Sequence, residues 1–169
     1  MSEPTDPRWD DSLRDYPEIA IEIAVFIGNF NALEAILHLA FSQMLGDGGR
    51  VTHCVLSPWN SFSQRLKIIT QVCRLYPQHP NSVEILAKDA ALRELNTFRN
   101  LLAHSAYSAS KNNVDAISYI VSAREPKLTP ITGPLLNENR KKYKLVRDAL
   151  VAVITPSTGE DRHIYSRPA

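Results

Sequence analysis

The sequence predicts an all-α protein, a bundle of about four helices with a small β-hairpin after the third helix. Apolar residues recur three or four positions apart over four long stretches, which is the period of a helix face turned toward a core. Glycine or proline residues end the first two stretches. The 169 residues suffice for one domain with a sizeable core, and 44% hydrophobic with 22% charged residues are ordinary globular values.

The first helix is expected to begin near Asp15, because Asp15 and Glu18 have capping-box spacing and Pro17 is tolerated in a first turn. The glycines within residues 46–49 end it. Its core stripe consists of eight large apolar residues: Ile19, Ile23, Phe26, Phe30, Leu33, Leu37, Phe41 and Met44. A second apolar set lies off this stripe, at Ile21, Val25, Ile36 and Leu39. Such a helix is central in its bundle or is shared with another subunit, so we expect a homodimer.

Residues 50–60 are expected to be irregular. Ser61 and Gln64 form a capping-box pair that begins the second helix, and prolines at 77 and 80 end it. The third helix begins near Asn81 and runs to His104.

The pattern of residues changes after the third helix. Residues 106–123 hold an Asn-Asn turn between stretches with β-forming residues, which predicts the hairpin. Prolines and a glycine within 126–134 predict a linker, and a last helix covers about 134 to 153. The expected organisation is a flexible arm over 1–14, one domain over 15–153 and a flexible tail over 154–169.

Charge and targeting features limit the function classes. The formal net charge is +1, so a nucleic-acid partner would have to be met by a local patch. The polar, acidic start does not resemble a signal peptide, and residues 19–45 contain too many polar side chains for an expected membrane span. Two cysteines do not make a disulfide framework, so a reducing cytoplasm is the expected compartment.

Several motifs fall short of a cofactor or metal site. The segment LGDGGR at 45–50 lacks the Gly-Lys-Ser/Thr ending of a phosphate loop. Glu34 and His38 are four apart, whereas helical di-iron sites use a Glu and a His three apart. The histidines at 53, 79 and 163 are expected in loops or in the tail, so we expect no metal and no cofactor. The basic run NRKKYKLVR at 139–147 is a solvated helix face or a track for a phosphate backbone.

The stretch FRNLLAHS, residues 98–105, holds the strongest candidate site. On a helix, Asn100 and His104 are one turn apart and share a face, whereas Arg99 lies about 140° from His104 at roughly 100° per residue. Only a side chain as long as that of Arg could bring its charged group next to Asn100 and His104. The plain alternative is an exposed Arg, an Asn, and a C-terminal His that complements the helix dipole.

The stretch RNLLAH resembles the signature of HEPN domains, a superfamily of small helical bundles. That signature is Arg, a polar residue that is often Asn, three to five further residues, and His, and Arg99, Asn100 and His104 match its shortest spacing. The layout is similar too, since the motif closes a long amphipathic helix, and the resemblance covers roughly residues 15–153. One subset, the toxins paired with nucleotidyltransferase antitoxins, carries a Tyr two residues after the His; Tyr107 stands three after.

The resemblance implies a metal-independent ribonuclease acting on single-stranded RNA, a toxin or defence effector, with an active site where two motifs meet across a homodimer. His104 then acts as the base, Arg99 stabilises charge on the phosphate, and Asn100 orients one of them. Glu34 is a candidate carboxylate that lies behind Arg99 and holds its guanidinium without touching the substrate, or else it is an exposed helix residue. Two other hypotheses stay open. One is a catalytically silent HEPN-like module that dimerises or binds a partner protein or nucleotide, and the other is a plain bundle in which the motif is accidental.

Overall fold

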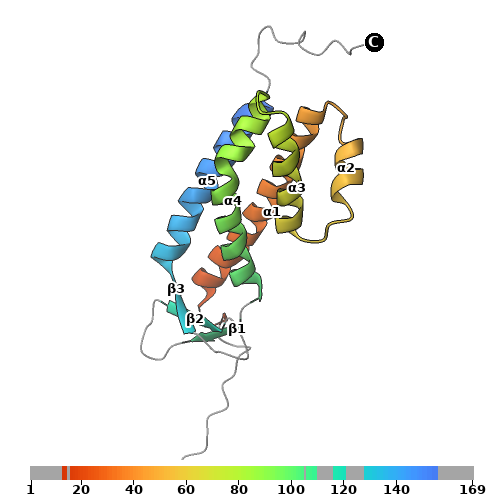
Figure 1. Ribbon diagram of the computed structural model, residues 1–169. Helices are drawn as coiled ribbons and strands as arrows, with labels where there is room; N and C mark the ends of the chain where they lie inside the picture. The colour runs from red at the N-terminus through yellow and green to blue at the C-terminus, as the bar shows by residue number, and fades with distance from the viewer. Residues whose placement is uncertain (1–12, 15, 105, 110–115, 121–127, 156–169) are drawn as a thin grey trace, which may run out of the picture.

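The computed structural model describes residues 13–14, 16–104, 106–109, 116–120 and 128–155, and these form a helical bundle with a small sheet at one end (Figure 1). The predicted all-α bundle is therefore confirmed. The predicted arm and tail fall almost wholly on residues 1–12 and 156–169, outside the described part. The helices are α1 Pro17–Leu45, α2 Arg50–Leu56, α3 Phe62–Leu75, α4 Pro80–His104 and α5 Gly133–Ile154.

The core lies between α1, α3, α4 and α5, which run side by side, while the short α2 packs on the outside next to α1 (Figure 1). Its fully buried side chains come from these four helices and from Ile131 of the short strand β3 (Leu128–Thr132), and among them are Phe30, Leu37, Leu66, Leu92 and Leu150. Polar contacts tie the layers together as well. Asn81 Nδ2 of α4 donates to the Ala40 carbonyl of α1 at 2.7 Å, deep inside the bundle.

The first helix ends as predicted and begins at Pro17, two residues after Asp15. Gly46 adopts φ 63° at its end, a left-handed conformation that glycine tolerates, and its amide bonds the carbonyls of Ser42 and Gln43. Tyr16 stands at the N-cap without a side-chain cap, and Asp15 lies outside the described residues.

The outer face of α1 stays apolar and uncovered by the described chain. Ile21 is 61% exposed and Leu39 is 48% exposed, whereas Ile36 is half-buried against the core. By length and composition α1 could cross a membrane, since its most apolar window has a mean hydropathy of 1.6. Core helices of globular bundles meet the same criterion, and the opposite side of α1 is packed into this core.

The expectation of an irregular stretch over residues 50–60 is wrong, because α2 occupies Arg50–Leu56. The Asp47 carboxylate organises the short connection that precedes it. This carboxylate accepts hydrogen bonds from the Gly49 and Thr52 amides at 3.0 and 2.8 Å, and from the Ser42 hydroxyl at 3.2 Å. A helix start held by one side chain in the preceding loop has no apolar period for sequence reasoning to detect.

The next two helices follow the prediction closely. The Ser61–Gln64 capping box is present, with both reciprocal bonds, at the start of α3. At the start of α4, the Asn81 amide donates to His79 Nδ1 at 3.1 Å. The Asn96 side chain of α4 then donates to the Ser63 hydroxyl at 2.9 Å, which places the first turn of α3 beside Asn96.

Three short antiparallel strands follow α4: β1 Ala106–Ala109, β2 Ala116–Ile120 and β3 Leu128–Thr132, in the order β1-β2-β3. The predicted hairpin corresponds to β1 and β2. The predicted linker over 126–134 is wrong, because it contains β3 and the start of α5. Pro130 suggested a linker because it has no amide to donate, and β3 lies at an edge of the sheet, where proline is tolerated. The Thr132 hydroxyl then caps α5 by accepting from the Leu135 amide at 3.3 Å.

Candidate functional site

The residues of the RNLLAH motif lie on the last two turns of α4, at the sheet end of the bundle (Figure 1). Phe98, which precedes the motif, is buried against Phe26 of α1. Because α3 begins beside Asn96, the motif extends along α4 past the start of α3. The structure thus places the three residues where α4 is flanked by α1 but no longer by α3.

Arg99 and Asn100 are brought together. The Arg99 Nη1 donates to Asn100 Oδ1 at 3.0 Å, so the long Arg side chain bends toward the helix face that Asn100 occupies. That face is the one on which His104 follows a single turn later. The Arg99 side chain therefore spans part of the angle that separates Arg99 from His104 around the helix.

The guanidinium of Arg99 retains donor capacity. Its Nε is buried and has no hydrogen-bond partner among the described residues, and its side chain as a whole is half-buried. A guanidinium presents five N–H donors in a planar fork that suits phosphate oxygens. The arrangement can accommodate an anion while Asn100 keeps the fork in place.

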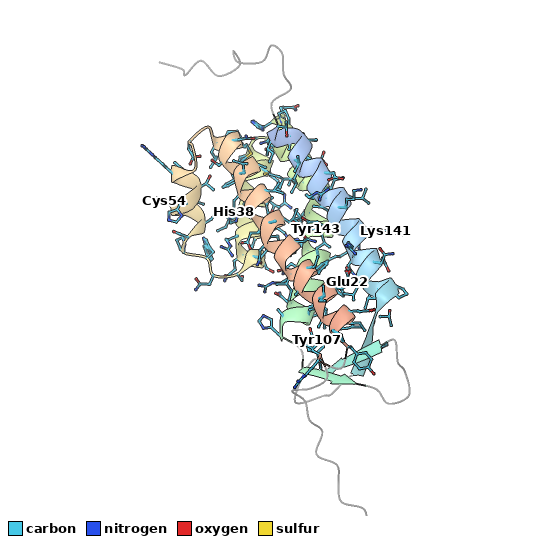
Figure 2. All side chains as sticks on the ribbon, turned by 180° about the vertical axis from the view of Figure 1, so that it is seen from behind. Glu22, His38, Cys54, Tyr107, Lys141 and Tyr143 are labelled. Atoms are coloured by element: carbon cyan, nitrogen blue, oxygen red, sulfur yellow. The ribbon has the colours of Figure 1, made fainter. Side chains whose placement is uncertain are left out.

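His104 is the last residue of α4, and its side chain is exposed. A C-terminal helix position leaves carbonyls without intrahelical partners. One of them, Leu102, accepts a hydrogen bond from the Tyr107 hydroxyl of β1. Burial raises the pKa of Tyr107 to about 12, which makes this hydroxyl a hydrogen-bond donor rather than a proton source near neutral pH. Tyr107 thus ties the last turn of α4, which carries His104, to β1. Figure 2 shows Tyr107 at the sheet end of the bundle.

The structure does not bring Glu34 to Arg99. The Glu34 carboxylate lies 2.7 Å from Arg65 Nη2 of α3 and 3.8 Å from His38 Nε2, one turn along α1. The α1 residue that packs against the motif's turn is Phe26, two turns before Glu34. Neither sequence reading of Glu34 describes it, since it is only 19% exposed and its partner is Arg65.

The partnership of Glu34 with Arg65 was missed because the two residues stand on different helices, and no local spacing links them. A single sequence contains no signal for such a pair beyond the two charges themselves. Sequence reasoning also missed that the Thr52 side chain is buried, because it did not predict α2.

Three of the five cations in the basic run on α5 are paired with carboxylates. Arg140 pairs with Glu22 at 3.1 Å, Arg147 pairs with Asp148 at 2.6 Å, and Lys142 contacts Glu94 of α4. Tyr143, within the run, is buried, while Lys141 lies on the outer side of α5 (Figure 2). This pattern is typical of a solvated helix face.

Within the described part of the chain, no group of three or more His, Cys, Asp and Glu side chains is placed to hold a metal ion. Of the histidines expected in loops, His53 instead lies on α2, His79 lies before α4, and His163 is outside the described residues. Cys54 is exposed and Cys73 is buried, and both are free thiols.

The motif supplies one exposed imidazole and one anchored guanidinium per chain. An imidazole can transfer a proton near neutral pH, and a guanidinium can stabilise negative charge on a phosphate. Comparison of the chain with protein-family models, with curated proteins and with solved structures gives no match.

Proposed function

We propose that the protein is a metal-independent RNA endonuclease of HEPN type, active as a homodimer in a reducing cytoplasm. The observation that carries the proposal is the Arg99–Asn100 hydrogen bond, which holds the guanidinium on the helix face that continues to the exposed His104. The resemblance of RNLLAH to the HEPN signature supplies the reaction. The corresponding biological role is that of a toxin or defence effector, which would have an antitoxin or another protein as its partner.

The proposed reaction uses the 2′-hydroxyl of RNA as its nucleophile. His104 takes the proton of that hydroxyl, and the 2′-oxygen attacks the adjacent phosphorus. Arg99 stabilises the charge that develops on the phosphate oxygens. The bond to the 5′-oxygen breaks, and His104 of the partner subunit donates a proton to that leaving oxygen. The products are a 2′,3′-cyclic phosphate and a 5′-hydroxyl.

A homodimer is needed because one chain offers one His104, whereas the reaction needs a base and an acid. The surface beside the motif suits such an association. Ile21 and Val25 are 61% and 41% exposed near the start of α1, the end of that helix that lies beside the motif. Neighbouring exposed apolar residues of this kind are typical of a surface that binds a partner.

The first experiment is cleavage of single-stranded RNA in excess EDTA, with DNA of the same sequence as a control. Arg99→Ala and His104→Ala are each expected to slow cleavage by at least ~100-fold, the usual contribution of one acid–base or charge-stabilising group. Arg93→Ala and His53→Ala are matched controls, because these side chains are exposed and lie away from the motif. Unchanged cleavage by His104→Ala would point to a contaminating nuclease and end the proposal.

The role of Asn100 is tested separately. The structure shows Asn100 accepting from Arg99, which favours orientation of the guanidinium. Asn100→Ala is expected to lose less activity than Arg99→Ala, because Arg99 keeps its charge. Asn100→Asp keeps an acceptor oxygen at the same place and should retain more activity than Asn100→Ala. The reverse order would assign Asn100 a different role.

Dimerisation has its own test. Ile21→Glu places a charge on the exposed apolar face of α1 and is expected to give a monomer that no longer cuts RNA. Val83→Glu is the control, since Val83 is 53% exposed on α4 near the other end of the bundle. Light scattering reports the mass and the RNA assay reports activity. A wild-type monomer of about 19.0 kDa that still cuts RNA would contradict the composite site.

A second candidate is a catalytically silent module that dimerises or binds a partner protein or nucleotide. The paired cations of α5 favour it, because Arg140, Lys142 and Arg147 already contact carboxylates and offer no uncompensated phosphate track. Absence of cleavage across a randomised RNA pool, with the dimer intact, would select this candidate.

A further inference from the structure

A cavity of about 660 Å³ opens between the second half of α1, the glycine-rich connection over residues 46–49, α2 and the start of α3. It lies at the opposite end of α1 from the motif on α4. Figure 2 shows His38, one of its lining residues, on the stretch of α1 that lies beside α2. The surface of the cavity is mostly apolar, and Leu39, which lines it, is 48% exposed although it stands on a central helix. The described chain therefore leaves an apolar hollow open here.

The charged side chains beside the cavity are directed into the protein and toward one another. Arg65 Nη2 lies 2.7 Å from Glu34 Oε1, and His38 Nε2 lies 3.8 Å from the same oxygen. Arg65 Nε, His38 Nε2 and Glu34 Oε1 are all buried, so they are closed to a molecule in the cavity. The Asp47 carboxylate of the glycine-rich connection already accepts from backbone amides of the next few residues. An occupant of the cavity therefore meets mainly apolar surface.

The end of α5 lies at the rim of this cavity. Gln43 of α1 lines the cavity, and its Nε2 donates to the carbonyl of Ile154, the last residue of α5, at 3.1 Å. Figure 1 accordingly shows α1 and α5 ending at the same end of the bundle. The described residues stop at Thr155, and the sequence continues with residues 156–169, which we call the C-terminal segment. At roughly 3.3 Å per extended residue, the first nine or so residues of this segment span up to about 30 Å, enough to reach any part of the cavity.

The composition of the C-terminal segment matches this surface. Ile164 and Tyr165 are its only large apolar residues, and they are adjacent. An acidic pair, Glu160 and Asp161, comes before them. No Asp or Glu is among the described lining residues of the cavity, and Arg50, the first residue of α2, is exposed beside the glycine-rich connection. A chain that leaves α5 at the rim thus brings its acidic pair within reach of Arg50 first and its apolar pair to the hollow next.

We propose that the C-terminal segment of the same chain docks in this cavity, with the Ile164 and Tyr165 side chains against Leu39 and the backbone of the glycine-rich connection. Docking covers Leu39, the exposed leucine of a helix whose other side is packed into the core. The loop to be closed is short and its first end is already held, because Gln43 binds the Ile154 carbonyl at the rim, so closure costs little entropy. This contact does not rest on the proposed nuclease activity, since it lies at the other end of α1 from the motif.

The test is disulfide trapping in the full chain, with Cys54→Ser in every variant to remove the exposed native thiol. The cavity pair combines His53→Cys, on the cavity lining, with Ser166→Cys, next to the apolar pair of the segment. The turn pair combines Gln78→Cys with Ser166→Cys. Gln78 is exposed between α3 and α4 at the same end of the bundle and does not line the cavity, so an undocked segment would reach both places. Under mild oxidation the cavity pair is expected to close at least ~10-fold faster than the turn pair, because docking raises the effective concentration of its thiols.

Ile164→Ser with Tyr165→Ser, added to the cavity pair, should slow its closure to the rate of the turn pair, because the docked side chains are lost. Ser157→Ala with Thr158→Ala is the matched control and should leave the rate unchanged. Equal closure rates of the two pairs would overturn the proposal. So would a covalent dimer that forms at the rate of the cavity pair when chains carrying one thiol of that pair each are mixed, because the cavity would then hold the segment of a second copy.

Discussion

Phe98 of α4 meets Phe26 of α1 edge to face, with ring centroids 5.0 Å apart and ring planes at 83°. This contact sets the height and rotation of the last turns of α4 relative to α1. Arg99 follows Phe98 directly, so the same contact determines the direction in which the guanidinium leaves the helix. An apolar pair thereby positions the polar motif.

Removal of this ring is expected to destabilise the whole bundle. Phe98→Ala should lower the free energy of unfolding by about 3–5 kcal/mol, through lost transfer energy and the cavity left beside Phe26. Thr97→Ala, on the exposed neighbouring position, should change it by less than about 1 kcal/mol. Urea denaturation monitored by circular dichroism measures both, and a Phe98→Ala protein as stable as the wild type would refute the proposed packing role.

Tyr107→Phe tests the closure of the α4 terminus. The Tyr107 hydroxyl donates to the Leu102 carbonyl, and its loss is expected to lower stability by about 1 kcal/mol, the usual net worth of one hydrogen bond. Hydrogen exchange should quicken at the last amides of α4 while the amides of α3 keep their protection. In the proposed nuclease, cleavage should fall because the turn that presents His104 is less fixed. Exchange that rises equally in both helices would contradict a local role.

Mild acid is expected to destabilise the fold through two histidines. Burial lowers the pKa of His38 and of His79 below the ordinary 6.5, and protonation of His79 at Nδ1 would also remove the acceptor of the Asn81 amide. Below 6.5 the unfolded chain therefore binds more protons than the folded chain. The free energy of unfolding should be highest above pH 6.5 and should fall as the pH drops toward the folded-state values.

Urea titrations at a series of pH values check this expectation. His38→Gln and His79→Gln should each reduce the pH dependence. The charged groups that act on His38 are Glu34 of α1 and Arg65 of α3. Stability that rises on acidification would show that Glu34 outweighs burial at His38.

The two thiols should differ in reactivity. Cys54 is exposed, whereas Cys73 is buried and burial raises its pKa to about 11. Since the thiolate is the reactive form, Ellman's reagent should titrate one thiol per native chain rapidly and both thiols in urea. Cys54→Ser should abolish the rapid phase. A rapid reaction that persists in Cys54→Ser would show that α3 opens readily.

The helices that carry their own apolar period and caps were predictable from sequence. The core face of α1 and the Ser61–Gln64 capping box are examples, because each depends on residues only a few positions apart. The placement of Arg99, Asn100 and His104 at the end of α4 followed from the same local rules.

Features that depend on contacts distant in sequence were not predictable. The α2 helix is held at its start by Asp47, and β3 tolerates Pro130 because β2 is its one partner among the described strands. The Glu34–Arg65 pair joins two helices, so local spacing favoured instead an exposed Glu34 or a place behind Arg99. The bend of Arg99 toward Asn100 likewise depends on side-chain torsions that helix geometry does not fix.

The long-range pairing of α1 has a consequence for how the chain is made. Glu22 cannot pair until Arg140 has been synthesised, 118 residues later. Gln43 cannot bond the Ile154 carbonyl until a further 111 residues have followed it. At the usual 5–20 residues per second, a ribosome takes on the order of ten seconds to deliver these partners. Until α5 arrives, the part of α1 that packs against α5 has no partner, whereas α4 can already cover the part around Phe26. The nascent protein is therefore expected to depend on a chaperone at the ribosomal exit, and messages truncated before α5 should yield insoluble chains.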